Sequence, residues 1–272
     1  MSLTIRSAIE QSGLVPVDAH ALLGHMLECD RAWLIAHASD MLDRAHADAF
    51  FALAKRRRDG EPIAYLTGRR EFWGLPLEVS PAVLIPRPET ETLVEAALAR
   101  LSTDGPWRVL DLGTGSGAIA IAFAHARPQA QVTGTDISDQ ALAVARSNAH
   151  RLALHNVQFV RADWYAGVET GPFDAILSNP PYIAPDDPHL SQGDLRFEPR
   201  GALTPGADAL QALKAIVTGA RDRLVHGGTL IVEHGYDQGE LVRRLFEGCG
   251  FDDVQSLRDL AGIHRVVAGR AP

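Results

Sequence analysis

The feature that most constrains this chain is a regular alternation of short apolar runs with helical segments after residue 105. Strands are predicted at 108–112, 131–136, 157–161, 174–178, 229–233, 253–257 and 264–268, and helices at 118–126, 139–152, 207–225 and 238–247. This alternation predicts an α/β fold in which helices cover both faces of a parallel sheet. The last two strands are joined only by residues 259–262, which is too short for a parallel crossover. One strand near the edge should therefore be antiparallel.

The first 70 residues have a different pattern, with helical spacing and no strand alternation. Leu22, Leu23 and Met26 share a stripe of one predicted helix, and a second is predicted at 44–58. Short helices cannot each bury a face alone, so we expect a small bundle. Between 71 and 86, apolar residues are broken by glycine and prolines, which favours a hairpin and linker. A helix is predicted to begin at 86–91 and to run to about residue 101.

Composition and charge restrict the possible partners and the compartment. The 272-residue chain has a net charge of -8, which argues against broad nucleic-acid binding. Cys29 and Cys249 cannot form a disulfide framework or a CxxC metal site, and reduced thiols in the cytoplasm are the simplest interpretation. The N-terminus has no secretory signal pattern, and no apolar run is long enough to cross a membrane. One basic run, 55–58, is either the solvated end of a helix or a docking patch for an acidic or RNA-bearing partner.

A glycine-rich turn follows the first strand of the alternating region and precedes a predicted helix. It consists of Gly113, Thr114, Gly115, Ser116 and Gly117. Glycines permit positive φ and close approach of a ligand to the backbone, and the helix N-terminus beyond offers free N–H groups. Ala118 and Ile119 follow Gly117 directly, so the spacing of the dinucleotide fingerprint is missing. A nucleoside site, or a tight turn without a ligand, remains possible.

Polar and aromatic side chains also end the next two strands. Asp136 could accept hydrogen bonds from both ribose hydroxyls, or it could cap the helix entered at 138–139. Asp163 and Trp164 together suit an adenine ring, the carboxylate for its amine and the indole for stacking. Trp164 alone would more often be a core residue. These elements end consecutive strands at the carboxyl edge of the sheet, where open α/β sheets bind ligands.

The fourth strand leads into Asn179, Pro180, Pro181 and Tyr182. Two prolines fix two φ angles and remove two backbone donors, so the chain leaves the strand in a rigid, extended turn. Backbone carbonyls beside the prolines are free to face a ligand, Asn179 adds an amide, and Tyr182 adds a flat ring. This combination suits a planar group bearing an NH2. The alternative is a proline-rich turn that merely ends the strand.

These motifs together resemble the class I S-adenosylmethionine-dependent methyltransferases that modify planar amino nitrogens. More narrowly, the chain is similar to the peptide chain release factor N5-glutamine methyltransferases. The similarity covers nearly the whole chain and includes segments 60–68, 85–91, 179–183, 196–199 and 233–235. Adenine and guanine methylases share the 179–182 tetrapeptide, and the flanking segments narrow the choice. Outside these segments, the first seventy residues resemble the family only in their general helical character.

The resemblance implies a Rossmann-like methyltransferase domain with a seven-stranded, mostly parallel sheet, at 87–272. A helical substrate-docking domain at 1–70 and a hairpin or linker at 71–86 would precede it. The glycine turn would hold the methionine part of S-adenosylmethionine, Asp136 the ribose and Trp164 the adenine region. Asn179 would lie beside the methyl sulfonium, and Asn179, Pro180 and Tyr182 would carry catalysis, with Pro181 completing the substrate site. No metal is required.

The implied substrate is the glutamine of the Gly-Gly-Gln motif in class I release factors, in the cytoplasm, without membrane or stable nucleic-acid binding. A DNA or RNA amino-group methylase is the alternative enzyme, and the acidic balance of the chain weighs against it. A cofactor-binding scaffold is the alternative without catalysis, and the intact tetrapeptide weighs against that. The glycine spacing disfavours a nicotinamide oxidoreductase.

Overall fold

The computed structural model describes residues 3–101, 105–168 and 171–272. The chain divides into two compact units. The first comprises Met1–Arg69 together with Ser191–Phe197, and the second comprises Arg70–Leu190 and Glu198–Pro272. None of the helices in these described ranges is both long enough and apolar enough to cross a membrane.

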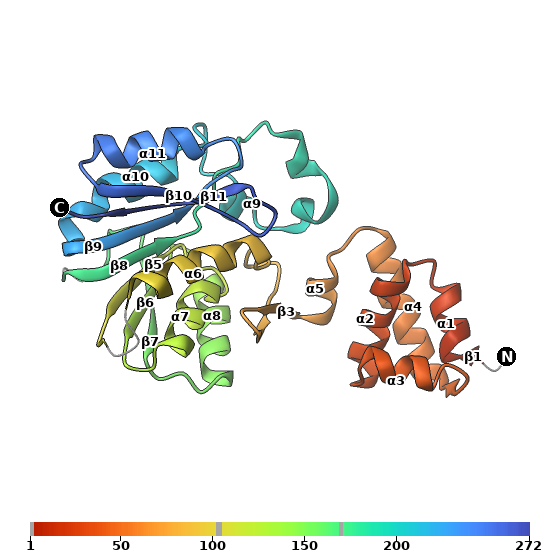
Figure 1. The fold of residues 1–272 in the computed structure, drawn as a ribbon. Helices are drawn as coiled ribbons and strands as arrows, with labels where there is room; N and C mark the ends of the chain where they lie inside the picture. The colour runs from red at the N-terminus through yellow and green to blue at the C-terminus, as the bar shows by residue number, and fades with distance from the viewer. Residues whose placement is uncertain (1–2, 102–104, 169–170) are drawn as a thin grey trace. The chain divides into compact units, whose positions relative to one another are not determined.

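A seven-stranded sheet forms the centre of the second unit, in the order β10-β11-β9-β8-β5-β6-β7 (Figure 1). The strands are β5 (Arg108–Leu112), β6 (Gln131–Asp136), β7 (Val157–Arg161), β8 (Phe173–Ser178), β9 (Leu224–Glu233), β10 (Asp252–Arg258) and β11 (His264–Arg270). Neighbours from β9 to β7 are parallel, whereas β11 is antiparallel to both β9 and β10. The predicted fold, with one antiparallel strand near the edge, is confirmed.

Helices cover both faces of this sheet, because its buried strands carry apolar side chains on both sides. Val109 packs into a core with α6 (Glu91–Arg100), α7 (Ala118–Ala126) and α8 (Asp139–Arg151). Its neighbour Leu110 packs into a second core with α10 (Gln211–Ala220) and α11 (Gly239–Gly248). Figure 1 shows α10 and α11 on one side of the sheet and α6, α7 and α8 on the other. This alternation of side-chain direction is what a strand buried on both faces requires.

The prediction of a helix at 207–225 is wrong at both ends, since α10 spans only Gln211–Ala220. Asp208 forms a turn that precedes α10, since its carboxylate accepts a hydrogen bond from the backbone N–H of Leu210. After α10, a 3-10 turn (η4, Arg221–Arg223) leads directly into β9, which begins at Leu224 rather than near residue 229. Gly227 and Gly228 interrupt the apolar pattern inside this strand. They therefore hid its first half from pattern analysis.

A hairpin precedes the first helix of this unit. Strands β3 (Arg69–Phe72) and β4 (Leu75–Glu78) pair across Trp73 and Gly74. Both turn residues have positive φ, 56° and 70°, as a tight two-residue hairpin turn demands. A 3-10 turn (η1, Pro88–Thr90) then leads into α6, so the helix start expected at 86–91 begins with a tighter turn. Glu91 is the first residue of α6. Its carboxylate accepts a hydrogen bond from the backbone N–H of Trp73 and so ties the hairpin to the helix.

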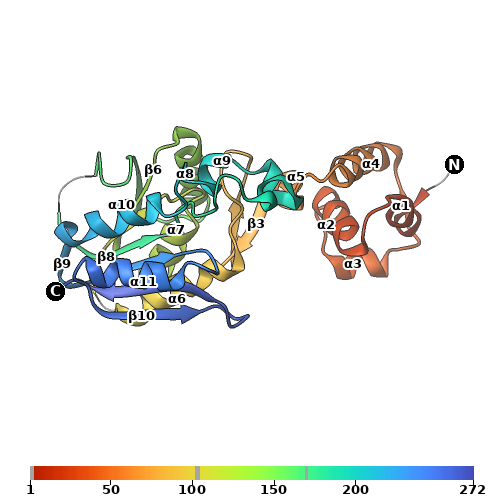
Figure 2. The same ribbon diagram turned by 90° about the horizontal axis from the view of Figure 1, so that it is seen from above.

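The first unit is a bundle of α1 (Ile5–Gln11), α2 (Pro16–Leu27), α3 (Arg31–Ala36), α4 (Arg44–Arg58) and α5 (Ile63–Thr67). Figure 2 gives a second view of these helices. Leu22, Leu23 and Phe50 are fully buried in its core, on the faces that helical spacing predicts. The sequence did not indicate β1 (Leu3–Thr4) and β2 (Met41–Leu42), which pair antiparallel. Two residues are too few to show strand alternation.

The basic run 55–58 ends α4, and each of its four side chains bonds within the first unit. Lys55 pairs with Asp59, Arg56 with Glu61, and Arg58 donates to the carbonyl of Ser12. Arg57 bridges Asp18 at 2.7 Å and Asp194 at 3.3 Å. Asp194 lies in the 184–206 loop, which is ordered into η2 (Pro188–Ser191), η3 (Gly193–Phe197) and α9 (Arg200–Leu203). Local acidic partners therefore neutralise much of this cluster.

Candidate active site

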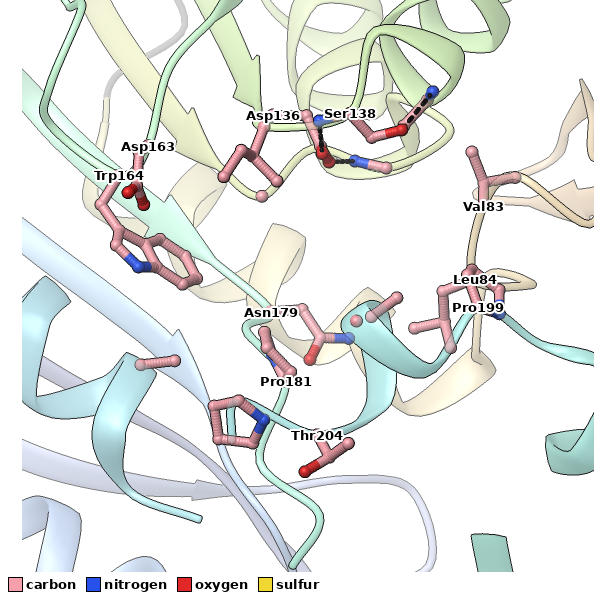
Figure 3. Close-up of a pocket in the computed structure, with 18 of the residues that line it drawn as sticks. Val83, Leu84, Asp136, Ser138, Asp163, Trp164, Asn179, Pro181, Pro199 and Thr204 are labelled. Carbon is pink, nitrogen blue, oxygen red and sulfur yellow. Dashed lines mark hydrogen bonds between the residues drawn. The ribbon is translucent and has the colours of Figure 1, made fainter. Parts of the chain in front are cut away.

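A cavity of about 620 Å³ opens at the carboxyl ends of the parallel strands of the second unit. Its size is that of a small-molecule site. Of the residues predicted for the site, it is lined by Gly113, Gly115, Asp136, Asp163, Trp164, Asn179 and Pro181. Figure 3 shows Asp136 and Ser138 across the cavity from Asn179 and Pro181, with Trp164 to one side and Val83 and Leu84 to the other. Four strand ends predicted separately thus meet at one site.

Thr114, Ser116 and Gly117 of the glycine turn do not line this cavity. Thr114 faces the interior, where its hydroxyl donates to Asp111 at 2.6 Å and its backbone N–H donates to the carbonyl of Thr135. Ser116 is buried, and Gly117 begins α7 with a φ of 85°. These three residues shape the turn, and they leave the backbone of Gly113 and Gly115 exposed to a ligand.

Asp111 lies beneath the turn, and no role was predicted for it from the sequence. Its Oδ2 accepts from Thr114 and from the backbone N–H of Ala120, whereas its buried Oδ1 has no hydrogen-bond partner among the described residues. Burial raises the pKa of this carboxyl to about 7, and the charge of nearby Asp136 adds to the rise. The signal in the sequence was a carboxylate inside an otherwise apolar strand.

Asp136 holds the turn from the end of β6. Its Oδ2 accepts from the backbone N–H of Gly115 at 3.0 Å, and its Oδ1 accepts from Ser138 at 2.9 Å. The capping role considered for Asp136 belongs to Ser138, whose hydroxyl accepts from the N–H of Ala141 in the first turn of α8. Asp136 therefore fixes the glycine turn and presents its carboxylate to the cavity.

Trp164 follows β7 and lines the cavity wall beside Asp163. Asp163 and Ala166 exchange two backbone hydrogen bonds, and the tight turn between them puts Trp164 at a φ of 49°. This left-handed conformation is rare for an aromatic residue and is maintained here by the turn. The indole lies close to the glycine turn: a Cβ added at Gly113 would be 3.7 Å from its ring. Trp164 thus lines the cavity and also packs, half-buried, against the second core.

The tetrapeptide at the end of β8 divides between the cavity and the interior. Asn179 and Pro181 line the cavity, and the Nδ2 of Asn179 donates to the hydroxyl of Thr90 at 3.1 Å. Pro180 is buried. Tyr182 is not among the lining residues, and its hydroxyl donates to Oε1 of Glu233 at 3.1 Å. The catalytic role that the resemblance implies for Tyr182 stays a prediction.

Thr90 and Glu233 are buried next to the tetrapeptide, and sequence reasoning gave neither a role. Glu233 ends β9 with no exposed surface, and its Oε2 accepts from the Thr90 hydroxyl at 2.6 Å. Burial raises the pKa of Glu233 to about 7, although hydrogen bonds from Thr90 and Tyr182 oppose the rise. A charged residue at the end of a buried strand was the available signal.

Comparisons with known proteins agree with this architecture. A family described as "PrmC N-terminal domain" matches residues 4–68, and one described as "Methyltransferase small domain" matches 90–193. A release factor glutamine methyltransferase of Xylella fastidiosa is 53% identical over 94% of this chain and 93% of its own length. A release factor glutamine methyltransferase of Bordetella pertussis is 51% identical over 97% of this chain and 98% of its own length.

Among solved structures, a methyltransferase from Pyrococcus furiosus matches with a TM-score of 0.56 and 20% identity. It covers 79% of this chain and 96% of that one, and at this identity it supports the fold alone. The two curated relatives, by contrast, share half of their residues with this chain along nearly their whole length. The chain therefore belongs to the family of release factor glutamine methyltransferases.

Proposed function

We propose that this protein transfers a methyl group from S-adenosylmethionine to the side-chain amide nitrogen of the glutamine in the Gly-Gly-Gln motif of class I release factors, in the cytoplasm. The observation that carries the proposal is the placement of Asn179 in the same cavity as Asp136 and Trp164. A group that can orient a planar amide thus lies beside groups that suit a nucleoside. The family to which the chain belongs supports the same reaction.

The residues of the cavity fit the cofactor. Backbone at Gly113 and Gly115 would lie against the methionine part, since neither carries a side chain there. The unpartnered Oδ1 of Asp111 beneath them is a buried acceptor with capacity for a further donor. Asp136 would hold the ribose hydroxyls, and Trp164 would stack on the adenine with Asp163 near its amine. When bound, the cofactor supplies an electrophilic methyl group on a sulfonium.

The acceptor amide needs to be oriented, because its nitrogen lone pair is delocalised into the carbonyl. The side-chain oxygen of Asn179 and the backbone carbonyl of Pro180 would each accept one N–H of the substrate amide; of these two residues, Asn179 lines the cavity and Pro180 is buried directly behind it in the chain. Fixing both N–H bonds aims the lone pair at the methyl group, and alignment of this kind can lower a barrier by several kcal/mol. The nitrogen becomes acidic as the new bond forms, so we assign no dedicated base.

The direct test is mass spectrometry of a class I release factor incubated with this protein and S-adenosylmethionine. A gain of one methyl group on the glutamine of the Gly-Gly-Gln motif is expected. Replacement of that glutamine in the release factor should abolish the gain. Methylation of nucleic acid instead, or of another side chain, would refute the proposal.

Replacing Asp136 with alanine is expected to weaken binding of S-adenosylmethionine. The change removes the proposed ribose acceptor and also frees the backbone N–H groups of Gly115 and Ser138. Loss of such an acceptor costs about 1–3 kcal/mol, which is about 5- to 150-fold in Kd. Calorimetry measures the affinity, and Asp136→Asn, which keeps one oxygen acceptor, should fall between wild type and alanine. Equal affinity in all three proteins would leave Asp136 with the turn-fixing role alone.

The helical unit is proposed to help dock the release factor, and the exposed end of α4 offers a test. Lys55→Glu is expected to lower kcat/KM for an intact release factor about three- to tenfold at low salt, since surface charges act mainly on association. Arg44→Glu is a matched control, because each cation pairs with an aspartate four residues later, Asp48 within α4 and Asp59 at its C-cap. A short Gly-Gly-Gln peptide should be methylated equally by both variants. Equal losses in the two variants would argue against a docking role for this end of α4.

A further inference from the structure

Two buried polar residues, Glu233 and Thr90, and the half-buried Asn179 form a continuous hydrogen-bonded chain that ends in the cavity. The carboxylate of Glu233, at the end of β9, accepts from the hydroxyl of Thr90 in η1 at 2.6 Å. The same hydroxyl oxygen accepts from the side-chain amide of Asn179 at 3.1 Å. Thr90 is 4% exposed and Glu233 is 0% exposed, so water does not compete for the bond between them.

The direction of these bonds follows from the number of protons each group has. An ionised carboxylate only accepts, so the single hydroxyl proton of Thr90 goes to Glu233. The oxygen of Thr90 then has only lone pairs left, and any partner on that side must donate. Asn179 can meet this demand only with its NH2 group, which turns its oxygen away from Thr90. Steric shape alone would not choose between the two ends of an amide, since oxygen and NH2 have nearly the same size.

We propose that Glu233 and Thr90 are positioning residues, which hold the amide of Asn179 with its oxygen toward the nitrogen to be methylated. This inference rests on the proposed function. If the amide of Asn179 were reversed, its N–H groups would face the N–H groups of the substrate, and neither set would find an acceptor. The chain of bonds therefore selects the one orientation of Asn179 that can bind the substrate amide.

Tyr182 connects the same carboxylate to the tetrapeptide a second time. Its hydroxyl donates to Oε1 of Glu233, so each oxygen of the carboxylate holds one segment of the site. One oxygen fixes the turn that precedes α6 and the other fixes the residue three positions after Asn179. Glu233 is thus connected to the side chain of Asn179 through Thr90, and to the segment that carries Asn179 through Tyr182.

This chain of hydrogen bonds should be sensitive to pH, because the direction in which its groups donate depends on an ionised Glu233. Burial raises the pKa of this carboxyl to about 7, and the charge of Glu89 acts in the same direction, whereas Arg265 on β11 opposes it. Tyr182 and Thr90 both donate to it and favour the ionised form. Below this pKa the carboxyl group gains a proton and can donate, so the proton of Thr90 is no longer directed to Glu233. The rate of methyl transfer should rise as the pH increases through about 7.

The test compares Thr90→Val, which deletes the hydroxyl at nearly constant shape, with Thr90→Ser, which keeps it. Full-length variants are assayed with S-adenosylmethionine and a Gly-Gly-Gln peptide. Thr90→Val is expected to lower kcat about 10- to 100-fold and to leave the Kd of the cofactor within about twofold. Thr90→Ser should restore kcat to within about threefold of wild type. The rise in rate through pH 7 should disappear in Thr90→Val.

Wild-type kcat in Thr90→Val, with its pH profile unchanged, would overturn the inference while leaving the proposed function intact. Should the wild-type protein itself fail to methylate the peptide and the intact release factor, the proposed function falls first. If Thr90→Val does not fold, Thr90→Ala takes its place with the same expected loss. A loss of rate in Thr90→Ser equal to that in Thr90→Val would also overturn the inference. The hydroxyl of residue 90 would then not be the group that orients Asn179.

Discussion

Methyl transfer is expected to slow by about a hundredfold or more when Asn179 is replaced by alanine. The change removes an acceptor from a partly buried site and leaves the substrate nitrogen free to rotate, and loss of one preorganised hydrogen-bonding group has effects of this size. The rate is measured under single turnover, with calorimetry to show that the cofactor still binds. If Asn179→Ala transfers methyl groups at the wild-type rate, the tetrapeptide at the end of β8 is only a turn.

Asn179→Asp separates binding from transfer at the same position. A carboxylate keeps an acceptor but adds a negative charge beside the proposed sulfonium, so cofactor affinity should hold or rise. Stabilising the charged ground state more than the less charged transition state raises the barrier. The carboxylate would also face Thr90, whose proton is already given to Glu233. Transfer is therefore expected to collapse in a variant that still binds cofactor, and a variant that lost both equally would contradict this reasoning.

Gly117→Ala is expected to destabilise the second unit by about 2–5 kcal/mol, since it combines a left-handed backbone with overpacking. Gly117 has a φ of 85°. A Cβ there would lie 2.9 Å from the side chain of Ile121 and 3.2 Å from those of Ala145 and Phe159. The contact at Ile121 is to its terminal Cδ1, which can turn aside, whereas the Cβ of Ala145 is fixed to the backbone of α8, so relief would require α8 to shift. Urea unfolding, followed by a probe in the second unit, measures the loss.

Gly115→Ala is the matched control, two residues away in the same turn. Gly115 also has a positive φ, 55°, but a Cβ there would meet nothing within 4 Å. We expect a stability loss of only about 1 kcal/mol, which is the backbone cost alone. Because Gly115 lines the cavity, the added methyl group should instead weaken cofactor binding. Equal stability losses in the two variants would show that backbone conformation, and not crowding, governs the turn.

The sheet was predictable because most of its strands are short and apolar, and because helices separate β5, β6, β8 and β9 from the strands that follow them. Strands β5, β6 and β7 lie at the predicted residues, since local pattern and tertiary burial agree there. Asp136, Trp164 and Asn179 could be placed at one edge because parallel strands bring their carboxyl ends together. Strand β9 was half missed, because its glycines conceal the pattern that its burial would otherwise produce.

Thr90, Asp111 and Glu233 show what the sequence could not reveal. Each is a polar residue whose partners lie far along the chain: Thr90 and Glu233, which bond to each other, are separated by 143 residues. A pattern of residue types indicates which side chains are buried, but not which proton is given to which oxygen. The orientation of Asn179 depends on that proton, and it became visible only once the three segments were in place.

The first unit is completed late in synthesis, because Ser191–Phe197 belong to it. Its buried core is built entirely from residues before 67 and can assemble as soon as they leave the ribosome. Asp194, the second partner of Arg57, is made 137 residues later. At synthesis rates of about 5–20 residues per second, Arg57 remains without this partner for about 7–27 s. The core residues of the helical bundle are therefore available early, and its last ion pair is added only after the strand that precedes Asn179 has been synthesised.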